Sequence, residues 1–67
     1  MTITLNNRSE TFDKELMSIA ELIKIKNFTF KALVVKINGQ LVRKNQYEEA
    51  VVHNGDKVDV IHLISGG

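Results

Sequence analysis

The residues best suited to chemistry in this sequence are the last two, Gly66 and Gly67, which follow an apolar run from Val58 to Ile64. Neither glycine has a side chain, so the backbone that ends at the Gly67 carboxylate is thin and conformationally free. Such an end can enter a narrow active-site channel, where another enzyme reaches the α-carboxylate. The pattern indicates a carboxylate that is itself a substrate; the alternative is a frayed chain end without a function.

Other reactive side chains are sparse. The chain has no cysteine, which excludes disulfides, a thiolate nucleophile and cysteine-ligated metals. His53 and His62 have no third ligand near them in the sequence, so we expect no bound metal. Glu48 and Glu49 are adjacent and cannot face each other across a substrate, as a general acid and base must. These side chains therefore give no support for a general acid and base pair.

Length and composition predict one small globular domain. The chain has 67 residues, of which 43% are hydrophobic and 25% charged, enough for a single core under a polar surface. A net charge of +1 creates no strong field for phosphates, so we expect no nucleic-acid partner. No apolar run approaches about 18 residues and no secretion signal is evident, which predicts no membrane association and a cytoplasmic location.

Two hairpins are predicted from turn residues between strand-forming segments. Asn6-Asn7 and Asn38-Gly39 both tolerate left-handed backbone, and an Asn-Gly pair is the strongest short hairpin signal. Alternating or β-branched residues flank both pairs. The predicted strands are residues 2–6 and 9–12 for the first hairpin, and 33–37 and 41–42 for the second.

A helix is predicted between the hairpins. Ser18 and Glu21 have the spacing of a capping box, in which each side chain bonds the backbone amide of the other residue. Apolar residues then recur at helical spacing, and the helix is expected to end near Lys26-Asn27. Phe28 and Phe30 lie beside basic residues; we interpret them as closing the end of the core, with stacking on single-stranded nucleic acid as the alternative.

The last third of the chain is predicted to end in a strand with two different faces. Residues 43–46 are expected to form a loop, residues 47–50 one helical turn, and Asn54-Gly55-Asp56 a tight turn. If Val58 and Val60 face the helix, then Ile61 and Leu63 point outward, because side chains alternate along a strand. Outward aliphatic residues beside the chain end suggest a docking patch. The order of elements predicts an α+β sheet with the helix across one face.

Together these features resemble the ubiquitin-like β-grasp sulfur carriers, and among them the sulfur carriers of thiamine biosynthesis. The resemblance spans essentially all 67 residues. It includes the first hairpin and the capped helix. Its individual positions are Ile37-Asn38-Gly39, Val42, Arg43-Lys44, Tyr47, Gly55-Asp56 and Gly66-Gly67. The resemblance implies a β-grasp fold, with a mixed sheet of four to five strands packed on one main helix. It also implies a single domain over residues 1–67, ending in a flexible tail at residues 64–67.

The resemblance also implies a role for each part of the chain end. An E1-like adenylyltransferase would use ATP to adenylate Gly67, and a cysteine desulfurase or sulfurtransferase would supply sulfur, leaving a thiocarboxylate for thiazole synthase. Ser65 and Gly66 would form the slim tail. Ile61, Leu63 and Ile64 would dock partners. The chain itself would be a carrier and not an enzyme, with no active site of its own and no bound cofactor.

Three alternatives remain open from the sequence. The chain end could serve as a molybdopterin synthase small subunit, which passes sulfur to a different acceptor. It could serve as a ubiquitin-like modifier, joined to lysines of other proteins. Alternatively, the chain is a non-covalent β-grasp interaction module, in which case the diglycine has no role.

Overall fold

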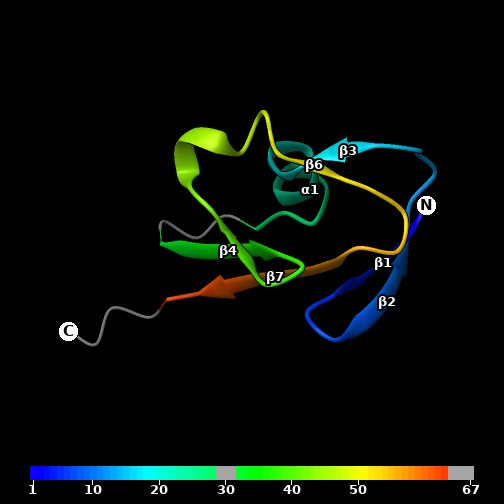
Figure 1. The fold of residues 1–67 in the computed structure, drawn as a ribbon, viewed down its shortest axis with the longest axis horizontal. Helices are drawn as coiled ribbons and strands as arrows, with labels where there is room; N and C mark the ends of the chain where they lie inside the picture. The colour runs from blue at the N-terminus through cyan, green and yellow to red at the C-terminus, as the bar shows by residue number, and fades with distance from the viewer. Residues whose placement is uncertain (29–31, 64–67) are drawn as a thin grey trace.

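The computed structural model describes residues 1–28 and 32–63. The sequence-based predictions for Phe30 and for the tail residues Ile64, Ser65, Gly66 and Gly67 lie outside these ranges. Within them the chain forms seven strands, one α-helix and one short 3-10 helix (Figure 1).

Both predicted hairpins are confirmed. In the first, β1 (Thr2–Leu5) pairs with β2 (Arg8–Thr11); in the second, β4 (Leu33–Ile37) pairs with β5 (Gln40–Val42). Both have two-residue turns with positive φ at each position: 50° and 67° at Asn6 and Asn7, and 50° and 83° at Asn38 and Gly39. Such turns match the right-handed twist of the strands, which is why these residues specify hairpins.

The helix α1 (Ile19–Ile25) begins at the predicted capping box. The Glu21 amide donates to Ser18 Oγ at 3.1 Å, and the Ser18 amide donates to Glu21 Oε1 at 3.3 Å. These bonds satisfy amides that have no partner within the helix. The helix ends at Ile25 with Lys26 as its C-cap, close to the end predicted from the sequence, and Asn27 follows with a φ of 56°.

The large sheet is mixed and has five strands in the order β2-β1-β7-β4-β5 (Figure 1). Its centre is β7 (Lys57–His62), which runs parallel to β1 and antiparallel to β4. The predicted fold class, an α+β mixed sheet of four to five strands with one main helix, is confirmed. The last strand in the sequence therefore joins the two hairpins.

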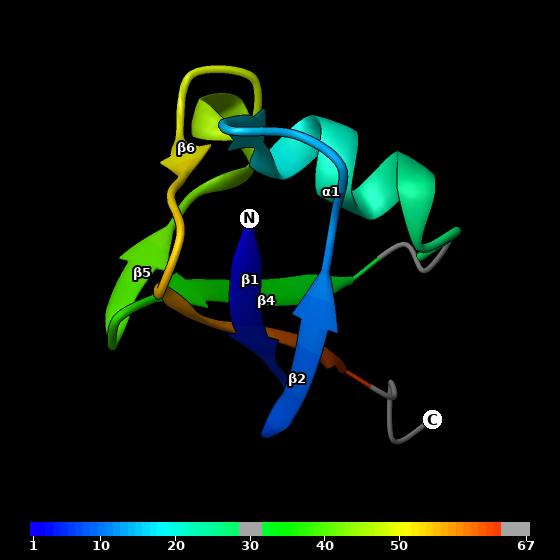
Figure 2. The ribbon, with the colours of Figure 1, turned by 90° about the vertical axis from the view of Figure 1, so that its right-hand side faces the viewer.

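All other elements lie on one side of this sheet (Figure 2). The core between the two layers consists of nine buried aliphatic or methionine side chains, and Phe28 packs against it, as expected for a residue that closes the core. The fully buried members are Ile3, Met17, Ile19, Leu22, Val35, Val52 and Val58. The opposite side of the sheet, which we call the outer face, is free of α1, β3 and β6.

Two details differ from the sequence-based prediction. A second, two-stranded sheet pairs β3 (Met17–Ser18) with β6 (Val51–Val52), and neither strand was predicted. The loop predicted at residues 43–46 is instead the 3-10 helix η1 (Lys44–Gln46), where Gln46 Oε1 accepts from the Arg43 amide at 3.1 Å. The turn predicted at residues 47–50 follows it, and the Ala50 amide donates to the Gln46 carbonyl at 2.8 Å.

Two ion pairs connect the helix layer to its surroundings. Lys26 at the end of α1 bonds Glu10 of β2 at 2.8 Å, and Lys14 bonds Glu21 at 2.7 Å. The hydrogen bond from Lys14 lowers the pKa of the Glu21 carboxyl below its ordinary value. In the part of the chain that the structure describes, no helix has the length and apolar character needed to cross a membrane.

Candidate functional site

The candidate site is the central strand β7 with the surface around it, because this strand leads to the predicted Gly67 substrate group. Asn38 fixes the beginning of the strand. Its backbone amide donates to the Lys57 carbonyl at 2.7 Å, and its Oδ1 accepts from the Lys57 amide at 2.9 Å. Its Nδ2 also donates to Asp56 Oδ1 at 3.0 Å, which links the hairpin turn to the turn before β7.

Asn6 fixes the middle of the same strand from the opposite side. Its amide donates to the Val58 carbonyl at 2.9 Å, and its Oδ1 accepts from the Val60 amide at 2.8 Å. The β1 to β7 pairing covers only Leu5 with Val58 and Thr4 with Lys57. The Asn6 side chain therefore extends this short parallel pairing to Val60 and satisfies a partly buried amide.

Beyond Asn6, β7 is held by β4. The register places Val34 opposite Ile61 and Leu33 opposite His62, and the Leu63 amide donates to the Ala32 carbonyl at 3.0 Å. The chain is therefore bonded to the sheet as far as Leu63, the last described residue.

The outer face of the sheet is aliphatic beside the end of β7. Ile61 is 46% exposed, Leu63 is 51% exposed, and Leu41 on β5 is 57% exposed. Val34, half-buried, lies between these strands because it is the direct partner of Ile61. We call Val34, Leu41, Ile61 and Leu63 the aliphatic half of the outer face. Exposed aliphatic groups gathered on one face are typical of a protein interaction site.

The other half of the outer face is covered by hydroxyl groups. Thr2 lies opposite Thr11, and Thr4 lies opposite Ser9, on β1 and β2. The Thr2 and Thr11 hydroxyls are 3.0 Å apart and share a hydrogen bond. We call these four residues the hydroxyl half. Water solvates such a surface well, so it has less to gain from an apolar partner.

The outer face carries charges of both signs. Lys36 on β4 lies directly opposite Asp59 on β7 and opposite Leu41 on β5, and the exposed Lys57 shares its face of β7 with Asp59. A partner that docks here meets both signs of charge among aliphatic groups. Within residues 1–28 and 32–63, no group of three or more histidine, cysteine, aspartate or glutamate residues is placed to hold a metal ion.

The structure brings together part of the predicted site. Ile61 and Leu63 lie on the outer face, with Val58 and Val60 buried beneath them, as the alternation along the strand predicted. Ile64, Ser65, Gly66 and Gly67 lie outside the described residues. The sequence analysis missed Val34 and Leu41. The sequence signal for Val34 is weak because Leu33, Val34 and Val35 are all apolar, so the pattern does not reveal which of these three side chains faces outward.

Comparisons with known proteins agree with this architecture. Residues 2–67 match the profile of the ThiS family. The sulfur carrier protein ThiS of Bacillus subtilis is 23% identical over 65 residues, which cover 97% of this chain and 98% of that protein.

Solved structures of similar proteins give the same result. The crystal structure of the thiamine biosynthesis protein ThiS from Geobacter metallireducens superposes with a TM-score of 0.87 at 26% identity and covers all of both chains. A solution structure of a thiamine biosynthesis protein from the same organism gives 0.81 at 25% identity, covering all of this chain and 88% of the other.

Proposed function

This chain belongs to the ThiS family, the sulfur carriers of thiamine biosynthesis, and we propose that its Gly67 carboxylate is the group that carries the sulfur. The observation that supports this proposal is the family match itself, which runs to residue 67 and so includes the terminal diglycine. The predicted β-grasp carrier fold, confirmed above, places β7 immediately before that end. The chain then acts as a substrate of its partners and not as a catalyst.

The chemistry of the proposed transfer follows from the carboxylate. A carboxylate is a poor electrophile, so an E1-like adenylyltransferase joins it to AMP from ATP, with release of pyrophosphate. The terminal sulfur of a persulfide on a cysteine desulfurase or sulfurtransferase attacks the carbonyl carbon, and AMP leaves. A thiol then cleaves the resulting sulfur–sulfur bond, which leaves a thiocarboxylate on Gly67 and a disulfide on the donor side. Thiazole synthase accepts this sulfur for the thiazole ring.

The residues before Gly67 have two roles in this proposal. Ser65 and Gly66 are small and let the end enter a narrow active site. Ile61, Leu63 and Ile64 dock the partner enzymes, and Val34 and Leu41 extend the same surface. Burial of aliphatic groups against a partner supplies affinity that the tail alone does not provide.

Intact mass spectrometry tests the proposal. The untagged protein is incubated with ATP, the adenylyltransferase and a sulfur source, and we expect a mass gain equal to the replacement of one oxygen by sulfur. A variant that lacks Gly67 should show no gain, while Thr4→Ala, in the hydroxyl half, should gain sulfur normally. An unchanged mass, with an adenylyltransferase shown to be active on another carrier, would refute sulfur transfer.

The same experiment, followed by addition of thiazole synthase to the product, separates the alternative functions. A modifier of proteins would yield lysine conjugates through Gly67 in place of a thiocarboxylate. A molybdopterin synthase subunit would gain the sulfur but would not pass it to thiazole synthase. A non-covalent module would show neither change, and loss of the diglycine would leave its binding intact.

A further inference from the structure

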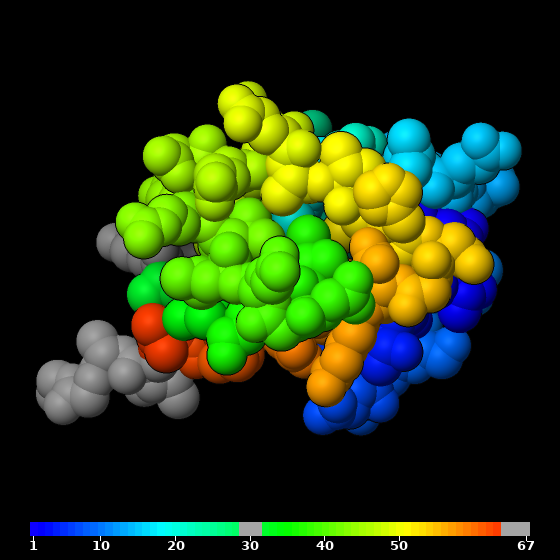
Figure 3. Space-filling view, viewed as in Figure 1, coloured from blue at the N-terminus to red at the C-terminus, as the bar shows by residue number. Residues whose placement is uncertain are grey.

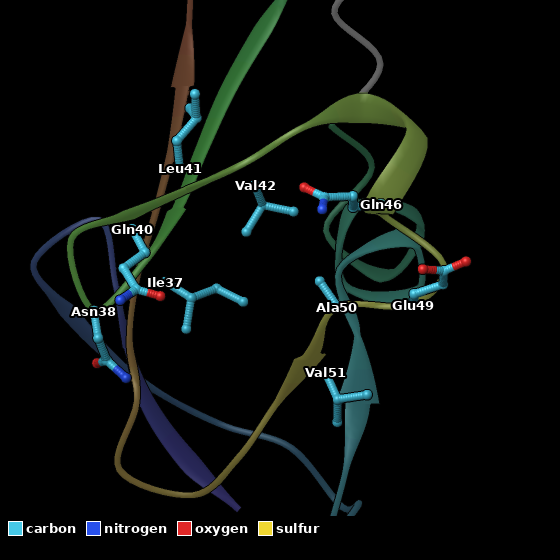
Figure 4. A pocket seen from close by; sticks show the side chains of 9 residues that line it. All are labelled: Ile37, Asn38, Gln40, Leu41, Val42, Gln46, Glu49, Ala50 and Val51. Atoms are coloured by element: carbon cyan, nitrogen blue, oxygen red, sulfur yellow. The ribbon is translucent and has the colours of Figure 1, made fainter.

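A hollow of about 540 Å³ lies beside β5, at the edge of the large sheet and away from the end of β7. Its floor is formed by Ile37, Val42 and Ala50, which are half-buried and pack against the core (Figure 4). One rim is the strand β5 itself. The other rim is the segment from η1 to β6, which contributes Glu49 and Val51. In Figure 3 the green atoms of the β4–β5 hairpin and the yellow atoms near residue 50 border this region.

The β5 rim presents backbone groups of a sheet edge. In a two-residue hairpin the residues next to the turn exchange both hydrogen bonds, here Ile37 with Gln40, and the next such pair is Val35 with Val42. The amide and carbonyl of Leu41 between them therefore point away from β4, and they have no hydrogen-bond partner among residues 1–28 and 32–63. Such an edge can pair with an added strand.

The floor of the hollow favours an aliphatic group. Ile37, Val42 and Ala50 form it, and Val51 on the other rim is 38% exposed, whereas Asn38, Gln40, Gln46 and Glu49 make the rest of the lining polar. In Figure 4 the side chains of Val42, Ile37 and Ala50 point into the hollow, whereas Leu41 points toward the outer face. An extended peptide places alternate side chains on one side, so one aliphatic side chain can fill the floor.

The charge of the hollow indicates a basic ligand. Glu49 is the one charged residue among those that line it, and it makes no ion pair with any described residue. A partner segment with a lysine or arginine two residues from an aliphatic residue matches both features, because alternate side chains lie on the same side of an extended chain.

We propose that this hollow is a peptide-binding groove, which takes an extended segment of a partner protein as a sixth strand beside β5. The segment bonds the Leu41 backbone, places an aliphatic side chain over Ile37, Val42 and Ala50, and places a basic side chain at Glu49. This site is separate from the sulfur chemistry, because it uses neither the tail nor the side chains of Ile61 and Leu63. It gives the carrier a second contact for recruitment to a larger assembly.

The test is an NMR titration of the isotope-labelled full chain with the blocked hexapeptide Thr-Val-Thr-Lys-Thr-Val, whose valine and lysine side chains lie on the same side of the extended chain. We expect saturable shifts at the amides of residues 40–42 and 49–51. Leu41→Pro removes the outward amide while keeping the bonds of Val42 to β4, and should weaken binding about fivefold. Leu41→Ala keeps the amide and should bind like the original chain. Ser9→Pro makes the same change on the other sheet edge, β2, and should also leave binding unaltered.

A charge reversal provides the second arm. Glu49→Lys should reverse the preference, so that the same hexapeptide with glutamate in place of lysine binds about threefold better than the lysine peptide. The Val35 amide shift in every variant reports whether the β4–β5 hairpin is intact. The proposal is overturned if no shift saturates, if the shifts gather on Val34 and Ile61, if Ser9→Pro weakens binding equally, or if the unliganded chain dimerises through β5.

Discussion

The two hairpins of this protein have the same construction but different surfaces. Each turns through two residues with positive φ, and each begins its turn with an asparagine whose Oδ1 accepts a backbone amide of β7. On the outer face, however, β1 and β2 present threonine and serine, whereas β4 and β5 present Val34 and Leu41. The backbone of a hairpin is therefore specified independently of the surface that it exposes.

This difference gives β7 two unlike neighbours. On the β1 side, the register covers two residue pairs and is then continued by the Asn6 side chain; on the β4 side, it covers five pairs. The longer pairing lies beside the aliphatic half. The strand that leads to the chain end is thus held most firmly where a partner is expected to dock.

The largest expected effect comes from the two turn asparagines. Asn6→Ala should destabilise the protein by about 3 kcal/mol, because alanine is strained at positive φ and the partly buried Val60 amide loses its acceptor. Asn38→Ala should cost about 1.5 kcal/mol, since water can reach the exposed Lys57 amide. Urea denaturation measures both free energies.

Two further variants separate the turn strain from the lost hydrogen bond. Asn6→Gly keeps a turn residue that accepts positive φ, so its cost should reflect mainly the missing Oδ1. Asn7→Ala, with a φ of 67°, should reflect mainly the strain. Equal losses for Asn6→Ala and Asn38→Ala would contradict the asymmetry between the two sides of β7.

The second prediction concerns the two halves of the outer face. Ile61→Asp should slow sulfur loading of the chain about 30-fold, which is the effect of removing a central apolar contact from an interface. Thr4→Asp, which puts the same charge in the hydroxyl half, should change the rate less than about twofold. The measurement is the initial rate of thiocarboxylate formation by intact mass. Equal effects would mean that docking does not distinguish the two halves.

A smaller effect is expected from the ion pair that ties one hairpin to the helix. Lys26 bonds Glu10 of β2 at 2.8 Å, and both side chains are about one-third exposed or less, at 31% and 29%. Glu10→Gln should lower the free energy of unfolding by about 0.5 kcal/mol. Thermal or urea denaturation at low and high salt checks this, because the difference should shrink as salt screens the pair. A difference that does not change with salt would contradict an electrostatic origin.

The smallest effect is expected from Glu21, which lies in neither hairpin and serves as a reference for the comparison. The hydrogen bond from Lys14 lowers its pKa in the folded protein. Because the pKa of Glu21 is lower in the folded than in the unfolded protein, its ionised carboxylate stabilises the fold at any pH above the unfolded pKa. This stabilisation is lost as the pH falls through the folded pKa. Glu21→Gln should therefore reduce the dependence of stability on pH below about 4.5, as measured by denaturation at several pH values. An unchanged pH dependence would contradict the pairing.

The elements that the sequence predicted correctly are those with local causes. Asn38-Gly39 requires positive φ, and Ser18 with Glu21 satisfies the first amides of the helix, so each pattern determines its own structure. The strands β3 and β6 have a distant cause. Two residues form a strand only because Met17 meets Val52 across the chain, and nothing local indicates that pairing.

The residues of the candidate site also differ in whether a local sequence pattern could reveal them. Ile61 and Leu63 followed from alternation within one strand, because Asp59 and the buried Val58 and Val60 mark its two faces. Val34 and Leu41 join them only through the register of three strands. The groove beside β5 also required the tertiary structure, since its two rims come from β5 and from the segment that leads to β6.

The central position of β7 has a consequence for how the protein folds. Each hairpin closes a loop of two residues, but β7 pairs with β1 across more than 50 residues of chain, so its entropic cost of closure is much larger. The hairpins and the helix can therefore form early, and the sheet is completed when β7 enters between them. Val34 meets Ile61 only at that last step. Under the proposed function, an enzyme that recognises the aliphatic half would select chains that have finished folding and would leave incomplete molecules without sulfur.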